Sequence, residues 1–240
     1  MTIGADELAL DAAVPRSALA IYAHPDDPEV GCGGTIAAWT RAGCVVHVVV
    51  CCRGEKGSSD HGADTDAVAR RRAQEVVDAA SVLGVAGHEF LGFDDGALAA
   101  ATDLRTRLVA LIRAFRPEAV LGPDPTAVFF GESYYNHPDH RALGWALLDA
   151  VSPSASNPHY EPGTGAAHAV TSVYLSGTLE PTCAIDISAS IDTKIDAVLR
   201  HTSQVEQPGE WFREAMRERA ADAGRRSGVR FAESFRRLRL

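Results

Sequence analysis

Short apolar runs alternate with longer amphipathic segments through the first half of the chain. The runs Ala18–Ala23 and Val45–Val50 are rich in β-forming residues and nearly continuous, which is typical of strands buried on both faces. Two further runs, His88–Leu91 and Glu118–Pro123, read as shorter strands. Strands that alternate with helices require parallel pairing with right-handed crossovers. We therefore predict an α/β fold, a Rossmann-like doubly wound mainly parallel sheet flanked by helices.

The intervening segments carry helix start and stop signals. The first predicted helix begins at Thr35 and ends at Gly43. The second covers residues 66–83, places its apolar residues on one stripe and ends at Gly84. The third covers residues 104–115, where Asp103 can act as its cap. Each helix thus separates two of the predicted strands.

A stretch rich in proline, serine, asparagine and glycine, residues 152–165, follows this region. Beyond it we expect two more strands, at 172–175 and 183–187, and two helices. The stretch could link two domains, but the C-terminal part is small to hold a core of its own. We therefore expect one domain, residues 1–240, with a long loop at about 152–165.

The net charge and the two terminal segments bear on the partners and the location that we expect for this protein. The formal net charge of −9 comes from 32 acidic and 23 basic side chains, which disfavours sequence-independent binding to nucleic acid. A basic C-terminal segment is the exception, and we interpret its arginines as a solvated helix face; they are Arg225, Arg226, Arg236, Arg237 and Arg239. The first 17 residues lack a long apolar core, so we expect no signal peptide, no membrane partner and a cytoplasmic location.

The five cysteines give little support for a thiolate metal site. Their number is odd, and none belongs to a CxxC pair. We expect them to be buried reduced thiols, because cysteines of cytosolic proteins usually act as small apolar residues.

The sequence YAHPDDPEVGCGGT, residues 22–35, places polar groups directly after the first strand. Ligands of such sheets gather at the carboxyl ends of the strands. A phosphate site is one interpretation, but Gly31 and Gly33 are followed by Ile36, which breaks the G-x-G-x-x-G pattern. The adjacent Asp26 and Asp27 would also repel a pyrophosphate. A metal site is the second interpretation, and a purely structural turn is the third.

The metal interpretation rests on two clusters. His24 and Asp27 lie three residues apart in the turn after the strand, and an imidazole with a carboxylate suits zinc. A catalytic zinc site needs a third protein ligand. The other comparable cluster, YYNHPDHRALG, offers His137, Asp139 and His140. Each His-Pro-Asp sequence could also serve only as a turn and helix cap, but two such clusters after strand ends favour a shared site.

The sequence resembles the zinc-dependent N-acetylglucosaminyl deacetylases of the LmbE-like, or PIG-L, family. The family's AHPDD motif stands here as AHPDDPEVGCGGT and its HxDH motif as HPDH. Five more segments look like family landmarks: RGEKGS, RAQEV, FLGFDDG, HTSQ and FAESF. The resemblance covers roughly residues 18–236, and the order and spacing of the motifs make the combination specific.

The resemblance implies a zinc site with three ligands: His24, Asp27 and His140. Asp26 matches the carboxylate that acts as general base, and His137 matches a second histidine at the reacting centre, with Asp139 placed to orient it. Some relatives carry a mobile tyrosine at the position of Tyr135. Its neighbour Tyr134 leaves open which tyrosine enters the site.

The implied reaction is hydrolysis of an N-acetyl amide on a small-molecule amino sugar conjugate, which releases acetate and a free amine. Zinc is the expected cofactor, although another divalent transition metal could occupy the same ligands. Arg53, Glu55 and Asn136 are candidate substrate contacts at the predicted crevice, while an ion pair between Arg53 and Glu55 is the structural alternative. Family members often form homo-oligomers.

Three alternatives remain open at this point. The chain could hydrolyse a different acyl amide with the same metal site. It could be a nucleotide-binding oxidoreductase, against which the broken glycine pattern argues. It could also be a sugar-binding module that has lost turnover, against which the complete set of predicted catalytic side chains argues.

Overall fold

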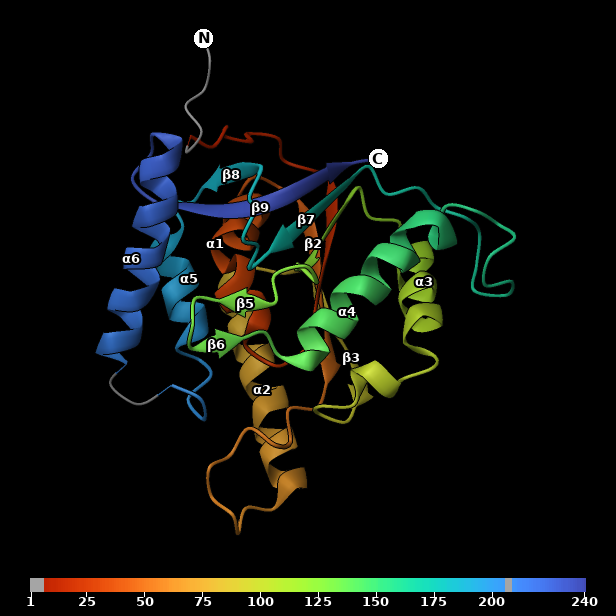
Figure 1. Cartoon of the computed structure of the whole chain (residues 1–240), viewed down its shortest axis with the longest axis horizontal. Helices are drawn as coiled ribbons and strands as arrows, with labels where there is room; N and C mark the ends of the chain where they lie inside the picture. Colours follow the sequence, from red (N-terminus) through yellow and green to blue (C-terminus); the bar gives the residue numbers. More distant parts are fainter. Residues whose placement is uncertain (1–6, 206–208) are drawn as a thin grey trace.

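The computed structural model describes residues 7–205 and 209–240, so part of the N-terminal segment discussed above lies outside the described residues. Within them, seven strands form one sheet in the order β3-β2-β1-β4-β7-β9-β8 (Figure 1). The parallel strands are β1 (Ser17–Tyr22), β2 (Val45–Cys52), β3 (Gly87–Phe93), β4 (Ala119–Pro123) and β7 (Ser172–Ser176). The predicted doubly wound, mainly parallel fold is confirmed.

The strand order places a crevice between β1 and β4. The chain runs from β1 to β2 and β3 in one direction, then returns to place β4 on the other side of β1. Such a reversal separates the connections that follow the two strands and leaves a ligand-binding crevice at their carboxyl ends. His24 follows β1 and Asp124 follows β4, so both lie at this crevice.

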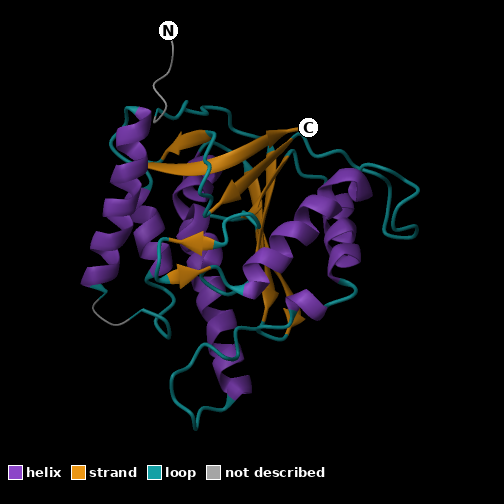
Figure 2. Cartoon of the chain, viewed as in Figure 1, coloured by secondary structure: helices purple, strands orange, loops and turns teal. Residues whose placement is uncertain are grey.

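Helices cover both faces of the sheet (Figure 2). One face packs against α1 (Asp27–Arg41) and α2 (Thr65–Leu83), and α5 (Ile191–Val198) packs on these two helices. The other packs against α3 (Leu104–Phe115) and α4 (Pro138–Asp149). The sixth helix, α6 (Glu210–Ser227), packs against α5 and the antiparallel strands. Among the described helices, none has the length and apolar character needed to cross a membrane.

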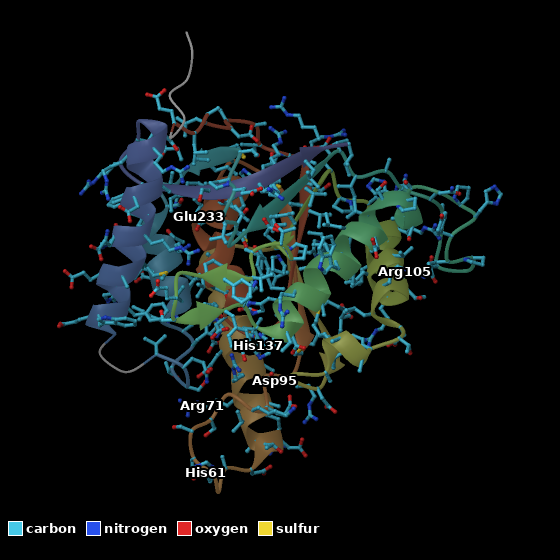
Figure 3. The ribbon with its side chains drawn as sticks, viewed as in Figure 1. His61, Arg71, Asp95, Arg105, His137 and Glu233 are labelled. Atoms are coloured by element: carbon cyan, nitrogen blue, oxygen red, sulfur yellow. The ribbon has the colours of Figure 1, made fainter. Side chains whose placement is uncertain are left out.

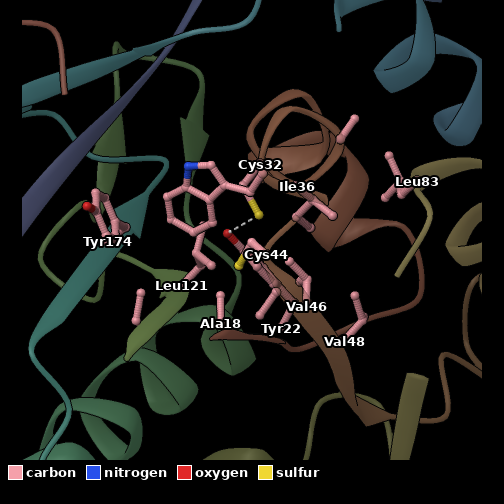
Figure 4. Close-up of a cluster of buried hydrophobic side chains, with 14 of the residues drawn as sticks. Ala18, Tyr22, Cys32, Ile36, Cys44, Val46, Val48, Leu83, Leu121 and Tyr174 are labelled. Carbon is pink, nitrogen blue, oxygen red and sulfur yellow. Dashed lines mark hydrogen bonds between the residues drawn. The ribbon is translucent and has the colours of Figure 1, made fainter. Parts of the chain in front are cut away.

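Alternate residues of β1 supply the two cores. Ala18, Ala20 and Tyr22 belong to the core beneath α1 and α2, while Leu19 and Ile21 belong to the core beneath α3 and α4. Figure 4 shows the first core, where the Tyr22 hydroxyl donates to the Cys32 sulfur at 3.2 Å. All five cysteines are buried and reduced, as predicted.

The first helix begins earlier than predicted, at Asp27 instead of Thr35. Pro28 in its first turn is compatible with a helix start, and the helix kinks at Cys32. Gly31, Gly33 and Gly34 make this stretch look unlike a helix in the sequence, but glycine is needed here for close packing. A Cβ on Gly34 would lie 2.7 Å from the side chain of Ile187, so only glycine lets α1 approach that residue.

The C-terminal segment also differs from the prediction. Arg225 and Arg226 lie exposed in the last turn of α6 as expected, but the segment after α6 is β9 (Ala232–Arg239). This strand pairs antiparallel with β7 and with β8 (Cys183–Asp186). Phe235 is fully buried and anchors β9 in the first core. Burial of Ala232, Glu233 and Phe235 between neighbouring elements outweighed the arginine-rich composition, so the helix interpretation of the tail was wrong.

Two shorter features complete the chain. Strands β5 (Phe129–Phe130) and β6 (Tyr134–Tyr135) form a separate antiparallel hairpin directly before α4. The loop at 152–165 wraps around the buried Arg113, which donates to the carbonyls of Ser154 and Asn157, among others. Strands from both sides of this loop join the same sheet. We propose on this basis that the chain is one domain.

Candidate active site

Three side chains from two distant segments meet at the crevice. His24 and Asp27 lie where β1 passes into α1, and His140 lies in the first turn of α4. Asp27 Oδ2 is 3.3 Å from His24 Nδ1 and 3.0 Å from His140 Nε2. The two imidazole nitrogens are 3.2 Å apart. The three predicted ligands thus present their donor atoms as a nearly equilateral triangle.

This triangle matches the donor set of a divalent metal. Zinc binds imidazole nitrogen and carboxylate oxygen at about 2.0–2.2 Å, which places tetrahedral ligands about 3.3–3.5 Å apart. The observed separations of 3.0–3.3 Å need only a small outward adjustment. Asp27 and His140 also line a cavity of about 600 Å³. A metal held here would therefore face open space.

The protonation of the triangle points to the same conclusion. Burial alone would lower the pKa of His24, but hydrogen bonds to Asp139, Asp27 and Asp95 hold it well above its usual range. Burial alone would raise the pKa of Asp27, but His140 and His24 hold it well below its usual range. The surrounding carboxylates thus stabilise a positive charge at this point, and a metal cation can supply that charge in place of a proton.

Asp139 holds the far side of His24. Its carboxylate Oδ2 lies 3.2 Å from His24 Nε2, and the backbone N–H groups of Gly96 and Leu98 donate to it at 2.6 and 3.0 Å. Burial would raise the pKa of Asp139, but these hydrogen bonds lower it to about 2. We had expected Asp139 to orient His137, but its carboxylate is 3.9 Å from His137 Nδ1. The structure instead shows a carboxylate–histidine pair of the kind that orients imidazoles at metal sites.

Asn136 has the equivalent position behind His140. Its side-chain oxygen is 3.0 Å from His140 Nδ1, and its amide nitrogen donates to the Ala127 carbonyl at 2.9 Å. Asn136 is buried. Both of its polar ends therefore have partners within the protein, and these contacts are those of a residue that orients His140. Asn136 also lines the cavity beside His140, so a contact with substrate stays a prediction.

Asp26 is the carboxylate next to the triangle that is not part of it. Its backbone has φ of 101°, a left-handed conformation that turns the chain between β1 and α1. The buried Arg72 lies 3.3 Å from Asp26 Oδ2 and also donates to the Pro25 carbonyl at 2.6 Å. Burial and the charge of Asp27 raise the pKa of Asp26 to about 7. Such a carboxylate can both accept and release a proton near neutral pH.

His137 stands at the rim of the same cluster as the N-cap of α4. Its Nδ1 accepts the backbone N–H of Asp139 at 3.2 Å, so the neutral ring carries its proton on Nε2. Burial and the nearby charge of His24 lower the pKa of His137, and the opposing effect of the Asp139 carboxylate does not offset them. Figure 3 shows His137 beside Asp95 at this end of the sheet.

The two tyrosines of β6 lie on opposite faces of the hairpin. Tyr134 lines the cavity together with His140, and its ring packs 5.7 Å from that of Phe130. Tyr135 is 65% exposed and is not among the residues that line the cavity. Successive residues of a strand point to opposite sides. The cavity-facing tyrosine in this conformation is therefore Tyr134, and a catalytic role for Tyr135 stays a prediction that requires the hairpin to move.

The remaining substrate candidates are engaged elsewhere. Glu55 is buried and accepts the backbone N–H of Asp95 at 2.9 Å, so it positions the loop after β3. Arg53 forms an ion pair with Asp66 and lies 3.7 Å from Asp94. The alternative of an Arg53–Glu55 pair is therefore not what the structure shows. Neither side chain lines the cavity beside the triangle, so the structure does not place them as substrate contacts there.

Sequence reasoning did not assign several residues that support the site. Asp95, in the FLGFDDG motif, lies 3.4 Å from His24 Nε2. Arg72, in the RAQEV region, holds the turn at Asp26. His201, in the HTSQ motif, is fully buried and lies 3.1 Å from the Glu29 carboxylate. These motifs were recognisable as landmarks, but no local pattern indicates which distant groups they contact.

Comparison with known proteins places this geometry in a family. Residues 19–151 match the family model described as PIG-L, GlcNAc-PI de-N-acetylase. Diacetylchitobiose deacetylase of Thermococcus kodakarensis is 34% identical over 226 residues, which cover 92% of this chain and 82% of that protein.

Solved structures show the same likeness. N,N'-diacetylchitobiose deacetylase from Pyrococcus horikoshii superposes with a TM-score of 0.85 at 28% identity and covers 94% of this chain and 84% of its own. A 4-carboxy-2-hydroxymuconate hydratase from Pseudomonas putida, 24% identical, has a TM-score of 0.76 over 93% of this chain and 96% of its own, a likeness of fold alone. The segment that matches the family model includes all three residues of the triangle. The chain belongs to the PIG-L, or LmbE-like, family.

Proposed function

We propose that this protein is a metal-dependent deacetylase that hydrolyses an N-acetyl amide on an amino sugar conjugate and releases acetate and a free amine. The observation that carries the proposal is the triangle of His24, Asp27 and His140 with the separate carboxylate of Asp26 beside it. Family membership and the deacetylase relatives support the reaction class. Zinc is the metal that we propose, because two imidazoles and one carboxylate form a common catalytic zinc donor set.

The metal would be held by the three residues of the triangle. A bound divalent metal polarises a carbonyl and lowers the pKa of water from 15.7 to about 7. Asp139 and Asn136 would keep the two imidazoles in their present orientation, because each accepts a hydrogen bond from the ring nitrogen that faces away from the triangle.

Asp26 would transfer the proton. A carboxylate with a pKa near neutrality can take a proton from the attacking water and later give it to the leaving nitrogen. This division explains the two adjacent aspartates: Asp27 is committed to the triangle, while Asp26 is held apart from it by Arg72. The left-handed backbone of Asp26 is what lets neighbouring side chains take these separate directions.

His137 would stabilise the charge that develops on the acetyl oxygen. Its Nδ1 is occupied by a backbone N–H, so its Nε2–H is the donor available to a substrate. One well-placed donor of this kind is worth roughly 3 kcal/mol of transition-state stabilisation. The lowered pKa of His137 keeps the ring neutral, which suits a hydrogen-bond donor.

The contacts at the glycine-rich turn bear on the nucleotide alternative. Gly34 packs against Ile187, and Glu233 accepts the backbone N–H groups of Gly34 and Thr35. A phosphate would need these N–H groups for itself. The turn therefore favours the hydrolase over a nucleotide-binding oxidoreductase. The experiment below distinguishes the proposed deacetylase from a hydrolase of another acyl amide and from a binding module without turnover.

The test pairs metal content with amine release from a glycoside of N-acetylglucosamine. We expect about one zinc per chain and activity in the wild type. Asp26→Ala should keep the metal and lose activity, whereas His140→Ala should lose both. Wild-type protein that stays metal-free and inert after zinc addition would contradict the proposal. Zinc-loaded protein that is inert only on acetylated sugars would indicate a different acyl amide as substrate.

We further propose a cytoplasmic location, which fractionation of cells would test.

A further inference from the structure

The cavity beside the triangle extends well beyond it. At one end it is bounded by Asp27 and His140, and its lining continues through Phe130 and Tyr134 of the β5–β6 hairpin to Arg219 of α6. The loop after β7, with Gly177 and Thr178, forms part of its wall. Its volume of about 600 Å³ lies within the range of about 300–1,000 Å³ that holds drug-sized ligands. The cavity thus offers space for a group attached to the reacting sugar.

Apolar and aromatic side chains form part of the lining of this cavity. Phe130 and Tyr134 come from the hairpin, with ring centroids 5.7 Å apart, and Leu179 comes from the loop after β7. Tyr134 and Leu179 are 55% and 53% exposed. Exposed apolar side chains that converge on one cavity provide a surface for an apolar or ring-shaped ligand group.

The wall formed by α6 carries two arginines and one aspartate, although the protein as a whole has a net charge of −9. Arg219, Asp222 and Arg226 line the cavity there. Asp222 is neutralised by an ion pair with Arg225, which is not part of the lining. Arg219 is exposed and forms no ion pair with any other residue in the described ranges 7–205 and 209–240. Its guanidinium is therefore available to a ligand.

We propose that this cavity binds the remainder of the substrate, and that the amino sugar carries a ring-containing group that ends in an anion. The N-acetyl sugar would lie at the triangle, the ring group against Tyr134 and the hairpin, and a carboxylate or phosphate at Arg219. A guanidinium pairs with either anion through two parallel hydrogen bonds. This inference rests on the proposed function, because it names the class of conjugate that the same site hydrolyses.

The experiment compares three glycosides of N-acetylglucosamine that differ only at the far end of the aglycone: phenyl, 4-carboxyphenyl and 4-phosphonooxyphenyl. Amine release gives kcat/KM for each glycoside with the zinc-loaded wild type, with Arg219→Gln and with Arg217→Gln. Arg217 is the matched control, because it lies on the same helix but pairs with Asp192 and does not line the cavity.

We expect the wild type to prefer one or both anionic glycosides over the phenyl glycoside by about tenfold, the effect of one charge-assisted contact. Arg219→Gln should abolish this ratio, whereas Arg217→Gln should keep it. The anion with the larger ratio identifies the carboxylate or the phosphate. Equal kcat/KM for all three glycosides in the wild type would overturn the proposal, as would a ratio that survives in Arg219→Gln.

Calorimetric binding of the same glycosides separates this inference from the proposed function. If no glycoside is hydrolysed but the anionic ones bind about tenfold more tightly in an Arg219-dependent manner, the deacetylase proposal fails and the cavity assignment stands. If the phenyl glycoside is hydrolysed as fast as the others and binding shows no preference, the deacetylase stands and the cavity assignment fails. If the protein neither hydrolyses nor binds any of them, both fail.

Discussion

Replacement of Asn136 by alanine separates two roles that this residue could have. The side chain joins His140 Nδ1 at 3.0 Å to the Ala127 carbonyl at 2.9 Å. Its removal frees the imidazole to rotate and leaves the Ala127 carbonyl without this donor. Loss of a partner that orients a metal-binding histidine typically weakens metal affinity by about 10–100-fold. A residue that contacts only the substrate would instead raise KM and leave metal affinity unchanged.

The size of the expected effect follows from these two contacts. A 10–100-fold loss of metal affinity corresponds to about 1.4–2.7 kcal/mol. The metal-free protein should lose about 1–3 kcal/mol of unfolding free energy, because one buried hydrogen-bond partner is missing. Asn136→Asp should recover much of the metal affinity, since a carboxylate oxygen can accept from His140 Nδ1 as the amide oxygen does.

The assay is a competition titration of zinc against a chromophoric chelator, carried out on the wild type, Asn136→Ala and Asn136→Asp. Steady-state kinetics at saturating zinc then measure kcat and KM. The reasoning is refuted if Asn136→Ala binds zinc as tightly as the wild type and differs only in KM. It is also refuted if Asn136→Asp is as defective in zinc binding as the alanine variant.

Three further changes test other parts of the site and fold. Asp26→Asn should reduce kcat about 10²–10⁴-fold with zinc retained, and an active variant would exclude Asp26 as the proton carrier. The charge of Arg72 lowers the pKa of Asp26, and the carboxylate form is the base. The acidic limb of the kcat/KM profile should therefore move to higher pH in Arg72→Met but stay in place in Arg72→Lys; identical limbs would contradict this. Lys194 pairs with Glu233 at 2.5 Å and both are buried, so Lys194→Met should cost about 3–5 kcal/mol in urea unfolding, and a cost below 1 kcal/mol would refute a compensated buried charge.

The sequence determined the features that depend on short segments. Apolar strands between helical segments predicted the doubly wound sheet, because burial on both faces leaves a pattern within each strand. That the two His-Pro-Asp clusters share one site was predictable for a similar reason, because polar groups that follow strands of one parallel sheet gather at its carboxyl edge. The choice of His140 as the third member of the triangle came from the resemblance to the family and not from the residues alone.

The residues that support the triangle were decided by the tertiary structure. Asp139 had been assigned to its neighbour His137, yet its carboxylate lies closer to His24, more than one hundred residues earlier. Position at the predicted crevice makes Asn136 and Glu55 candidate substrate contacts, but Glu55 is buried against the loop after β3 and does not line the cavity. Asn136 lines the cavity, and its side chain also joins His140 to the Ala127 carbonyl. The sequence shows which element carries a polar side chain, but not which distant group forms its hydrogen bond.

The same limit applies to the outer part of the site. Strand β9 was hidden by its arginines, because its burial depends on β7 and β8 lying on either side of it. The cavity wall at Arg219 exists only because α6 packs against that antiparallel edge. Periodicity and motif spacing report local backbone geometry and the chemistry of nearby residues. Strand register and helix packing bring together residues far apart in the chain, and these long-range contacts decide which charges are paired and which face a ligand.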